Sequence, residues 1–286
     1  MRVLITGSKG QLGRALGQAL AKETIFNFDL PEMDITDYRQ TSQVITDLQP
    51  EVVIHCAAFT NVDGCETDPD TAYQVNALGT QNVALACQRA GSAMVYISTN
   101  EVFDGTKTGP YLEFDQPNPI NAYGRSKLAG EQYVQMLTLK FYIVRISWLY
   151  GEGGDNFVRK MIRRADEQRS LSVVDDEIAS PTYAKDLAKA LAQLVRQPQY
   201  GIYHLTNSGA CSRYEWAREI MFLTGREHIP VRPISSKEYV RASRPPLNGQ
   251  LRNYCAEKAL GITLRPWREA LEDFVVTNWA GLVKGT

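Results

Sequence analysis

The chain has no excess of charge of either sign. Its 286 residues include 31 lysines and arginines against 32 aspartates and glutamates. No segment is rich in Lys and Arg, so the sequence offers no positively charged surface that would attract a nucleic acid. A nucleic-acid partner is therefore not expected.

Long apolar segments are also missing. A helix that crosses a membrane shows a run of about eighteen or more apolar residues, and no such run occurs. The apolar start Met1-Arg-Val-Leu-Ile-Thr6 is too short to predict a signal peptide. We therefore expect a cytoplasmic protein with no membrane partner.

Paired cysteines are absent as well. The five cysteines are widely scattered, and no two of them form a Cys-x-x-Cys motif. An odd, scattered set predicts reduced thiols that pack in the interior. Neither a structural zinc nor another metal is expected.

A glycine-spaced turn follows the first predicted strand. The apolar segment Arg2–Thr6 leads into Gly7, Gly10 and Gly13, and a helical pattern begins at Arg14. Gly7 would allow a sharp turn, Gly10 would let the backbone approach a pyrophosphate, and Gly13 would let the helix pack on a sheet. The spacing departs from the dinucleotide fingerprint G-x-G-x-x-G, and a merely flexible turn is the alternative.

The second predicted strand ends in a carboxylate. Thr24–Asp29 places Asp29 where an acid hydrogen-bonds the adenosine ribose, which favours NAD. Lys9, inside the turn, would attract the additional phosphate of NADP, unless it is only a solvated loop charge. The two signals oppose each other, so the sequence predicts NADPH or NADH without choosing between them.

Tyr123 and Lys127 form a Tyr-x-x-x-Lys pair. On a helix this spacing puts the phenol and the ammonium on one face, where the cation favours ionisation of the tyrosine. Such a tyrosine can donate a proton near neutral pH. The alternative is a surface helix with a solvated lysine, but the glycine turn upstream favours a reductase site.

Apolar strands and helical segments alternate regularly up to residue 150. Glu51–His55, Ala93–Ser98 and Phe141–Ile146 are predicted strands, and Thr71–Ala90 is predicted to be one long helix. This alternation predicts an α/β fold, a Rossmann-like doubly wound parallel sheet. Residues 1–150 would form a dinucleotide-binding domain. Residues 151–286 would mainly form a smaller substrate lobe, with some segments returning to the first domain.

Polar residues directly follow the strand that ends at Ser98. Ligands of parallel sheets bind beyond the carboxyl ends of the strands, so Thr99 and Asn100 are expected to face the cofactor crevice. The Thr99 hydroxyl would hydrogen-bond a substrate oxygen beside Tyr123. Alternatively, Ser98 and Thr99 only cap the strand.

Taken together, these motifs resemble the dTDP-4-dehydrorhamnose reductase family of extended short-chain dehydrogenases/reductases. The resemblance covers nearly the whole chain. Besides the glycine turn and the Tyr123 motif, it rests on His55–Asp63, Tyr73–Gly79, Ile97–Gly105, Arg145–Gly151 and Ser180–Leu187.

The resemblance implies reduction of the 4-keto group of dTDP-4-dehydro-6-deoxy-L-mannose to dTDP-L-rhamnose, or of a closely related sugar nucleotide. Tyr123 would donate the proton to the oxygen at C4, and Thr99 would orient the carbonyl. Lys127 would hold the nicotinamide ribose and lower the pKa of Tyr123. A monomer or homodimer is expected.

The resemblance also implies further binding residues. Trp148 would lie against the sugar ring, although a core tryptophan is the alternative. The pyrophosphate turn, the adenine side and the nicotinamide wall would be formed by Gly7, Gly10, Gln11, Leu12, Gly13, Asp34, Ile35, Ala57 and Ala58.

The chain departs from the family pattern at two places. The family usually has Ser-Thr-Asp-Tyr where this chain has Ser98-Thr-Asn-Glu101, so Glu101 either hydrogen-bonds a sugar hydroxyl or points to solvent. The loop that should close over the nucleotide sugar begins at Arg244, is one residue longer and lacks its serine. The identity of the sugar therefore stays open at this point.

Two other functions remain as alternatives. A related regulatory subunit of methionine adenosyltransferase keeps the dinucleotide domain without catalysis, but the intact Thr99, Tyr123 and Lys127 argue against this reading. An epimerase or dehydratase would recycle tightly bound NAD. A dehydratase requires an acidic pair after the threonine, and Asn100-Glu101 supplies half of it.

Overall fold

A six-stranded sheet forms the centre of the computed structural model, which describes residues 1–283. The strand order is β10-β5-β4-β3-β1-β2, and all neighbouring strands are parallel. The strands are β1 (Arg2–Thr6), β2 (Thr24–Phe28), β3 (Val52–His55), β4 (Ala93–Thr99), β5 (Phe141–Ile146) and β10 (Gly201–His204). The inner strands are continuous apolar runs because both sheet faces are covered.

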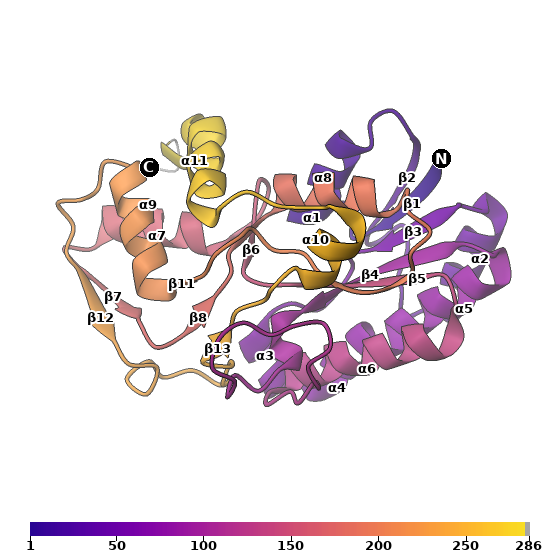
Figure 1. Cartoon of the computed structure of the whole chain (residues 1–286), viewed down its shortest axis with the longest axis horizontal. Helices are drawn as coiled ribbons and strands as arrows, with labels where there is room; N and C mark the ends of the chain where they lie inside the picture. The colour runs from indigo at the N-terminus through magenta and orange to yellow at the C-terminus, as the bar shows by residue number, and fades with distance from the viewer. Residues whose placement is uncertain (284–286) are drawn as a thin grey trace.

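Helices cover both faces of this sheet (Figure 1). One face carries α1 (Gln11–Ala19), α8 (Ala184–Leu194) and α10 (Tyr254–Leu260), whose apolar side chains share a core with β1 and β5. The other carries α2 (Tyr38–Leu48), α5 (Thr80–Ala90) and α6 (Ala122–Leu137). The predicted α/β fold with a doubly wound parallel sheet is confirmed.

The chain reverses its course across the sheet at β1. It first moves from β1 to β2 on one side, and then returns to β3 on the other side. The loops after β1 and β3 therefore diverge at the carboxyl ends of the strands. Such a switch point is where open parallel sheets bind ligands.

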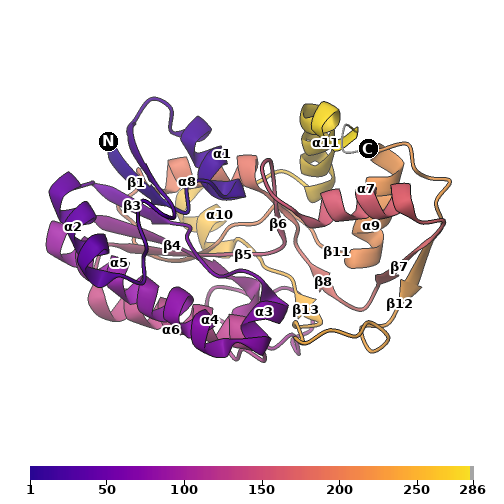
Figure 2. The same cartoon turned by 180° about the vertical axis from the view of Figure 1, so that it is seen from behind.

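The second lobe lies beyond those carboxyl ends (Figure 2). It contains α7 (Phe157–Glu167), α9 (Arg213–Leu223) and α11 (Trp267–Val283), and the pair β7 (Leu171–Val174) with β12 (Val231–Ile234). These elements enclose a separate apolar core. Meanwhile α8, β10 and α10 return to the large sheet, although they follow residue 150.

The remaining elements are short. They are α3 (Val62–Thr67), α4 (Pro69–Tyr73), the π-helical turn η1 (Gln74–Gly79), the 3-10 turn η2 (Asn100–Val102), β6 (Leu149–Tyr150), β8 (Ile178–Ala179), β9 (Thr182–Tyr183), β11 (Cys211–Ser212) and β13 (Asn248–Gly249). In the described part of the chain, no helix combines the length and the apolar character that a membrane crossing requires.

The expected single helix over 71–90 is wrong in one respect, since η1 interrupts it. Asn76 within η1 is buried and uses its side chain outside the helix. Its amide group accepts from the Phe59 N–H at 2.8 Å and donates to the Ser126 hydroxyl at 3.0 Å. These bonds connect the widened turn to the loop after β3 and to α6. Tertiary contacts, rather than local helix propensity, therefore account for the π-helical turn.

Candidate active site

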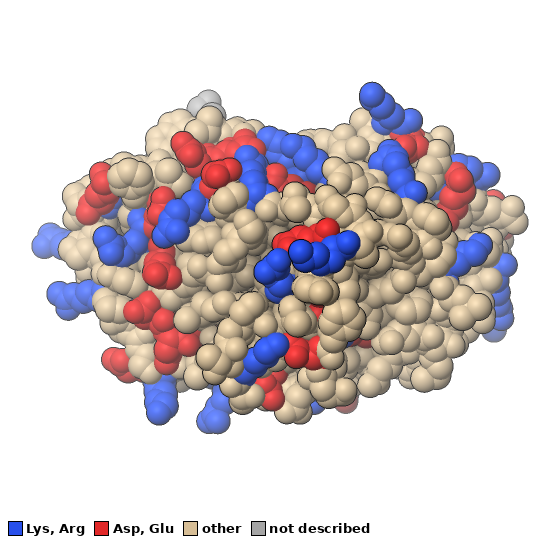
Figure 3. All heavy atoms as spheres, in the orientation of Figure 1, with Lys and Arg blue, Asp and Glu red and all other residues tan. Residues whose placement is uncertain are grey.

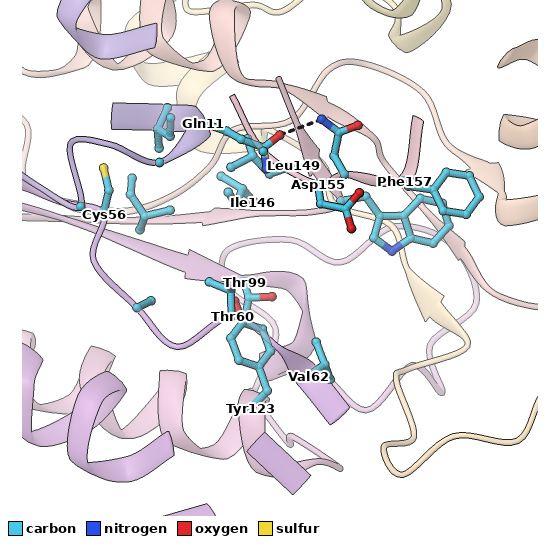
Figure 4. A pocket seen from close by; sticks show the side chains of 18 of the residues that line it. Gln11, Cys56, Thr60, Val62, Thr99, Tyr123, Ile146, Leu149, Asp155 and Phe157 are labelled. Atoms are coloured by element: carbon cyan, nitrogen blue, oxygen red, sulfur yellow. Dashed lines mark hydrogen bonds between the residues drawn. The ribbon is translucent and has the colours of Figure 1, made fainter. Parts of the chain in front are cut away.

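A cleft of about 1160 Å³ runs along the carboxyl ends of β1, β3, β4 and β5 and continues between α7 and β7. In Figure 4, Gln11 and Cys56 lie at the sheet end, Phe157 lies at the end of the second lobe, and Thr99 and Tyr123 lie between them. Every site residue expected from the sequence lines this cleft except Arg244.

The glycine turn forms a backbone cradle at the start of α1. Gly7 has a φ of +66°, and a Cβ there would meet the Ala57 backbone nitrogen at 2.7 Å. A Cβ on Gly13 would meet the Gly7 carbonyl oxygen at 2.5 Å, whereas at Gly10 the nearest atom is at 3.2 Å. No side chain caps the first turn of α1, no acid occupies it, and its residues Gln11, Leu12 and Gly13 line the cleft. This cradle fits a pyrophosphate.

Asp29 closes the cradle at the end of β2. Its carboxylate accepts from the backbone N–H of Lys9 at 2.8 Å and of Leu30 at 2.9 Å. The Lys9 ammonium lies 2.9 Å from a carboxylate oxygen of Glu32. Lys9, whose charge was expected to oppose the effect of Asp29 on the choice of cofactor, therefore forms an ion pair with Glu32.

The residues expected at the adenine side and at the nicotinamide side all line the cleft. Asp34 and Ile35 line the cleft, and the Asp34 carboxylate also accepts from the Thr36 hydroxyl at 2.8 Å. On the other side, Ala57 and Ala58 follow β3, with the Ala57 N–H held 3.3 Å from the Thr6 hydroxyl.

Two elements bring the expected catalytic side chains together. Thr99 ends β4, and Tyr123 and Lys127 lie on successive turns of α6. Helix α6 begins at Asn121, whose side-chain oxygen accepts from the Gly124 N–H at 2.8 Å. Figure 4 shows the Tyr123 ring pointing toward Thr99.

The expected lowering of the Tyr123 pKa by Lys127 is not found in the described residues. Burial raises the pKa of the Tyr123 phenol well above its ordinary value, and Glu101 raises it further. A hydrogen bond with the Thr99 hydroxyl has the opposite, smaller effect. The phenol therefore keeps its proton at neutral pH.

The Lys127 ammonium is itself buried. The side chain is 2% exposed, and its nitrogen lies 4.1 Å from the centre of the Tyr96 ring. Burial lowers the pKa of Lys127 to about 7, while the Glu131 carboxylate acts in the opposite direction. The charge of this lysine thus depends on its surroundings.

Glu101 turns into the cleft and not to solvent. It is partly buried in η2, next to the buried Asn100, and accepts from the Asn121 side-chain amide at 2.7 Å. Burial raises the pKa of Glu101 to about 7, and the Asn121 hydrogen bond and Arg213 partly oppose this rise. Of the two alternatives, the structure favours a carboxyl group on the substrate side of Thr99.

Trp148 lies at the junction of the cleft and the second core. It has a φ of 43°, and its ring stacks on Trp216 with a centroid distance of 5.6 Å. The Arg213 guanidinium lies 3.8 Å from the Trp148 ring centre and 4.0 Å from Glu177. Trp148 thus both packs against the second core and lines the cleft.

The expected role of Arg244 requires a correction. Its side chain is exposed and lies outside the cleft, while its carbonyl oxygen accepts from the Asn121 amide at 3.1 Å. The neighbouring Ser243 hydroxyl donates to Asp63 at 2.5 Å, which directs the loop over α3. Arg241 of the same loop lines the cleft instead.

Sequence reasoning missed the cluster formed by Arg213, Glu177 and Arg241. Both guanidinium groups pair with the one buried carboxylate of Glu177. The residues come from three separate segments, so no spacing in the sequence joins them. A capping box at Ser212 and Glu215, which starts α9 at Arg213, was the available signal.

Comparison with known proteins places this geometry in a family. The family model described as the RmlD substrate binding domain matches residues 1–278. The spore coat polysaccharide biosynthesis protein SpsK of Bacillus subtilis is 41% identical, with 96% of each chain covered. A dTDP-4-dehydrorhamnose reductase of Aggregatibacter actinomycetemcomitans is 37% identical, with 95% of this chain and 97% of the relative covered.

The structural comparison agrees. The crystal structure of the dTDP-4-dehydrorhamnose reductase of Bacillus anthracis in complex with NADP is 42% identical and superposes with a TM-score of 0.94. The match covers 96% of this chain and 99% of that chain. The present chain therefore belongs to the RmlD family of dTDP-4-dehydrorhamnose reductases.

Proposed function

We propose that this protein reduces the 4-keto group of dTDP-4-dehydro-6-deoxy-L-mannose with NADPH or NADH and releases dTDP-L-rhamnose. The observation that carries this proposal is that Thr99, Tyr123 and Lys127 line one cleft together with the glycine turn and Trp148, with the Tyr123 ring pointing toward Thr99 (Figure 4). Family membership supports the same reaction.

The cofactor would lie along the sheet end of the cleft. Gly7, Gly10 and Gly13 with Gln11 and Leu12 would hold its pyrophosphate. Asp29 would bind the adenosine ribose, Asp34 and Ile35 the adenine, and Ala57 and Ala58 the nicotinamide side. When bound, the cofactor supplies the hydride.

Tyr123 would donate its phenolic proton to the C4 oxygen as the carbonyl is reduced. A phenol that is fully protonated at neutral pH has that proton available. The Thr99 hydroxyl would orient the carbonyl, and Lys127 would hold the nicotinamide ribose and stabilise the phenolate that remains.

The nucleotide sugar would occupy the second lobe. Arg213 and Arg241 share one carboxylate, so an additional anion such as a diphosphate would complete the charge balance of this cluster. Trp148 would contact the sugar, and Glu101 would accept a hydrogen bond from one of its hydroxyl groups, with Asn100 beside it.

The epimerase or dehydratase alternative is not favoured. Asn100 stands where a dehydratase would need an acid, and two relatives that are 37% identical to this chain bear the name dTDP-4-dehydrorhamnose reductase. Intact catalytic side chains likewise argue against a purely regulatory subunit.

We further propose that the enzyme works in the cytoplasm as a monomer or homodimer, without a nucleic-acid partner. The balanced charge supports the last point. Figure 3 shows blue and red side chains intermixed on the face in view, without a broad field of one sign.

The test is an assay of NADPH and NADH oxidation with dTDP-4-dehydro-L-rhamnose, followed by identification of the product by NMR. We expect oxidation that depends on the sugar nucleotide and a product of the L-rhamno configuration. Tightly bound NAD in the purified protein, with conversion of the sugar but no net cofactor oxidation, would instead identify an epimerase or dehydratase.

A further inference from the structure

A buried carboxylate lies one helical turn beyond Lys127. Glu131 of α6 is 0% exposed, and it is held from two neighbouring strands. The Ser98 hydroxyl of β4 donates to its Oε1 at 2.5 Å. The Arg145 guanidinium of β5 donates to Oε1 at 2.9 Å and to Oε2 at 2.7 Å. The reaction described above assigns no role to this group.

Its partners lie directly beside the catalytic residues. Ser98 precedes Thr99 in the chain, and Arg145 is the register partner of Ser98 across the sheet. Helix α6 also approaches β4 closely here, because a Cβ on Gly130 would clash with the Tyr96 hydroxyl. Glu131 thus joins the helix that carries Tyr123 and Lys127 to the strand end that carries Thr99.

The same carboxylate acts on the charge of Lys127. Among the described residues, the other groups that interact with this ammonium are the Tyr96 ring of β4, His55 of β3, Cys56 after β3 and Cys65 of α3.

These groups are neutral near pH 7. Burial lowers the pKa of His55 to about 3 and raises those of Cys56 and Cys65 to about 12 and about 11. Of the groups that oppose the effect of burial on Lys127, Glu131 acts most strongly, and its carboxylate is held 2.7 Å from the Arg145 guanidinium.

We propose that Glu131 is a positioning residue for the reduction: its carboxylate, fixed by Ser98 and Arg145, holds α6 against the end of β4 and keeps the buried Lys127 ammonium charged. This inference rests on the proposed function for its kinetic consequences. Its effect on Lys127 does not require the sugar substrate.

The decisive variant is Glu131→Gln, which keeps the size of the side chain and removes its charge. Loss of that charge makes the Lys127 proton easier to remove, so the alkaline limb of the pH profile should move to lower pH. A shift of one unit gives about a tenfold loss of kcat/KM near pH 8.5 and a change within about threefold near pH 6. Glu272→Gln, at an exposed carboxylate of α11, is the matched control and should leave the profile unchanged.

A second readout separates this proposal from the proposed function. Lys127 is expected to hold the nicotinamide ribose. The Kd for NADPH, measured by fluorescence without sugar, should therefore begin to rise at a lower pH in Glu131→Gln than in the wild-type protein. If the wild-type protein failed to reduce the sugar nucleotide, the function would be wrong, but this binding shift would still test Glu131.

A pairwise comparison then tests whether Glu131 acts through Lys127. The double variant Lys127→Met/Glu131→Gln should have a kcat within about twofold of that of Lys127→Met alone, because the lysine through which Glu131 acts is absent from both proteins. A full additional loss would overturn the proposal. So would a Glu131→Gln protein that loses activity equally at every pH, since that result indicates a structural role alone.

The stability of the Glu131→Gln variant depends on Arg145. Glu131→Gln leaves the buried Arg145 guanidinium without its anion, which can prevent folding. The double variant Glu131→Gln/Arg145→Met removes both charges, and a displacement of the NADPH Kd and kcat/KM profiles in the same direction, but smaller, is expected because the Arg145 cation is removed as well. Wild-type profiles in a folded double variant would overturn the proposal.

Discussion

At the scale of single residues, burial sets the protonation of the proposed proton donor. The Tyr123 phenol holds its proton firmly in the free protein, since both burial and Glu101 raise its pKa. A nearby cation is therefore needed to stabilise the phenolate that forms during proton transfer. Tyr123 and Lys127 have to be considered as one unit, which the spacing in the sequence already indicated.

Replacement of Tyr123 by Phe removes only this hydroxyl group. We expect the variant to bind NADPH normally and to lose on the order of 10² to 10⁴ in kcat, the usual contribution of general acid catalysis. Tyr73→Phe, at an exposed tyrosine of α4, is the control and should keep full activity. A Tyr123→Phe protein with nearly wild-type kcat would refute the assignment.

Glu101 is where we expect this chain to depart from the family pattern in the proposed substrate pocket. If its carboxyl group accepts a sugar hydroxyl, Glu101→Tyr should change kcat/KM for the nucleotide sugar by roughly tenfold to a hundredfold, the value of a hydrogen bond to a charged group. The Kd for the cofactor should stay nearly constant. Side-by-side kinetics decide the point, because unchanged kcat/KM would leave Glu101 without a role in recognition.

At the scale of single elements, α1 contains two glycines that differ in the space available for a side chain. Gly13 packs against the glycine turn, where a Cβ would lie 2.5 Å from the Gly7 carbonyl oxygen and from the Ser8 Cα. Gly17, one turn later, has no atom within 4 Å of the same position. The two sites form a matched pair on one helix.

Alanine at these two positions should therefore act in opposite directions. Gly13→Ala is expected to lower the free energy of unfolding by about 1 to 3 kcal/mol and to weaken cofactor binding, because the turn must move. Gly17→Ala should raise the free energy of unfolding by about 0.5 to 1 kcal/mol. Urea denaturation and NADPH titration of both variants test this; equal effects would contradict the packing at Gly13.

The turn between β2 and α2 bears on the choice of cofactor. Asp29 is expected to disfavour the 2′-phosphate of NADPH, and the ion pair of Lys9 with Glu32 is expected to reduce the attraction of Lys9 for that phosphate. We expect both cofactors to support turnover with a preference of less than about a thousandfold. Glu32→Gln should free the lysine and shift the ratio toward NADPH by about twofold to fivefold. A ratio of kcat/KM values that does not move would show that Lys9 lies away from this phosphate.

At the scale of the whole molecule, the sequence predicted the sheet better than the second lobe. Strands such as Val52–His55 are buried on both faces and therefore appear as continuous apolar runs. The substrate end depends on how separate segments pack together. For that reason Glu177 and Arg241 could not be located from the spacing of residues in the sequence. Arg244 was expected in the cleft, but its side chain is exposed, and Arg241 of the same loop lines the cleft instead.

The division of the chain at residue 150 is not a division of the fold. Strand β10 pairs with β5, and α8 and α10 cover the apolar face of the large sheet. A fragment of residues 1–150 would expose the edge of β5 and that face. We expect it to aggregate or to remain unfolded, as measured by size-exclusion chromatography and circular dichroism, and a monomeric, NADPH-binding fragment would contradict this expectation.

The late return of β10 also constrains biosynthesis. A chain emerges from the ribosome from its N-terminus, and domains that are complete in sequence can fold as they emerge. Here the large sheet and the helices that cover it are complete only after Gly201–His204 and Tyr254–Leu260 have left the exit tunnel. The nascent protein therefore carries an unfinished sheet for most of its translation, and chaperones that shield such edges should matter more for its yield than for its finished stability.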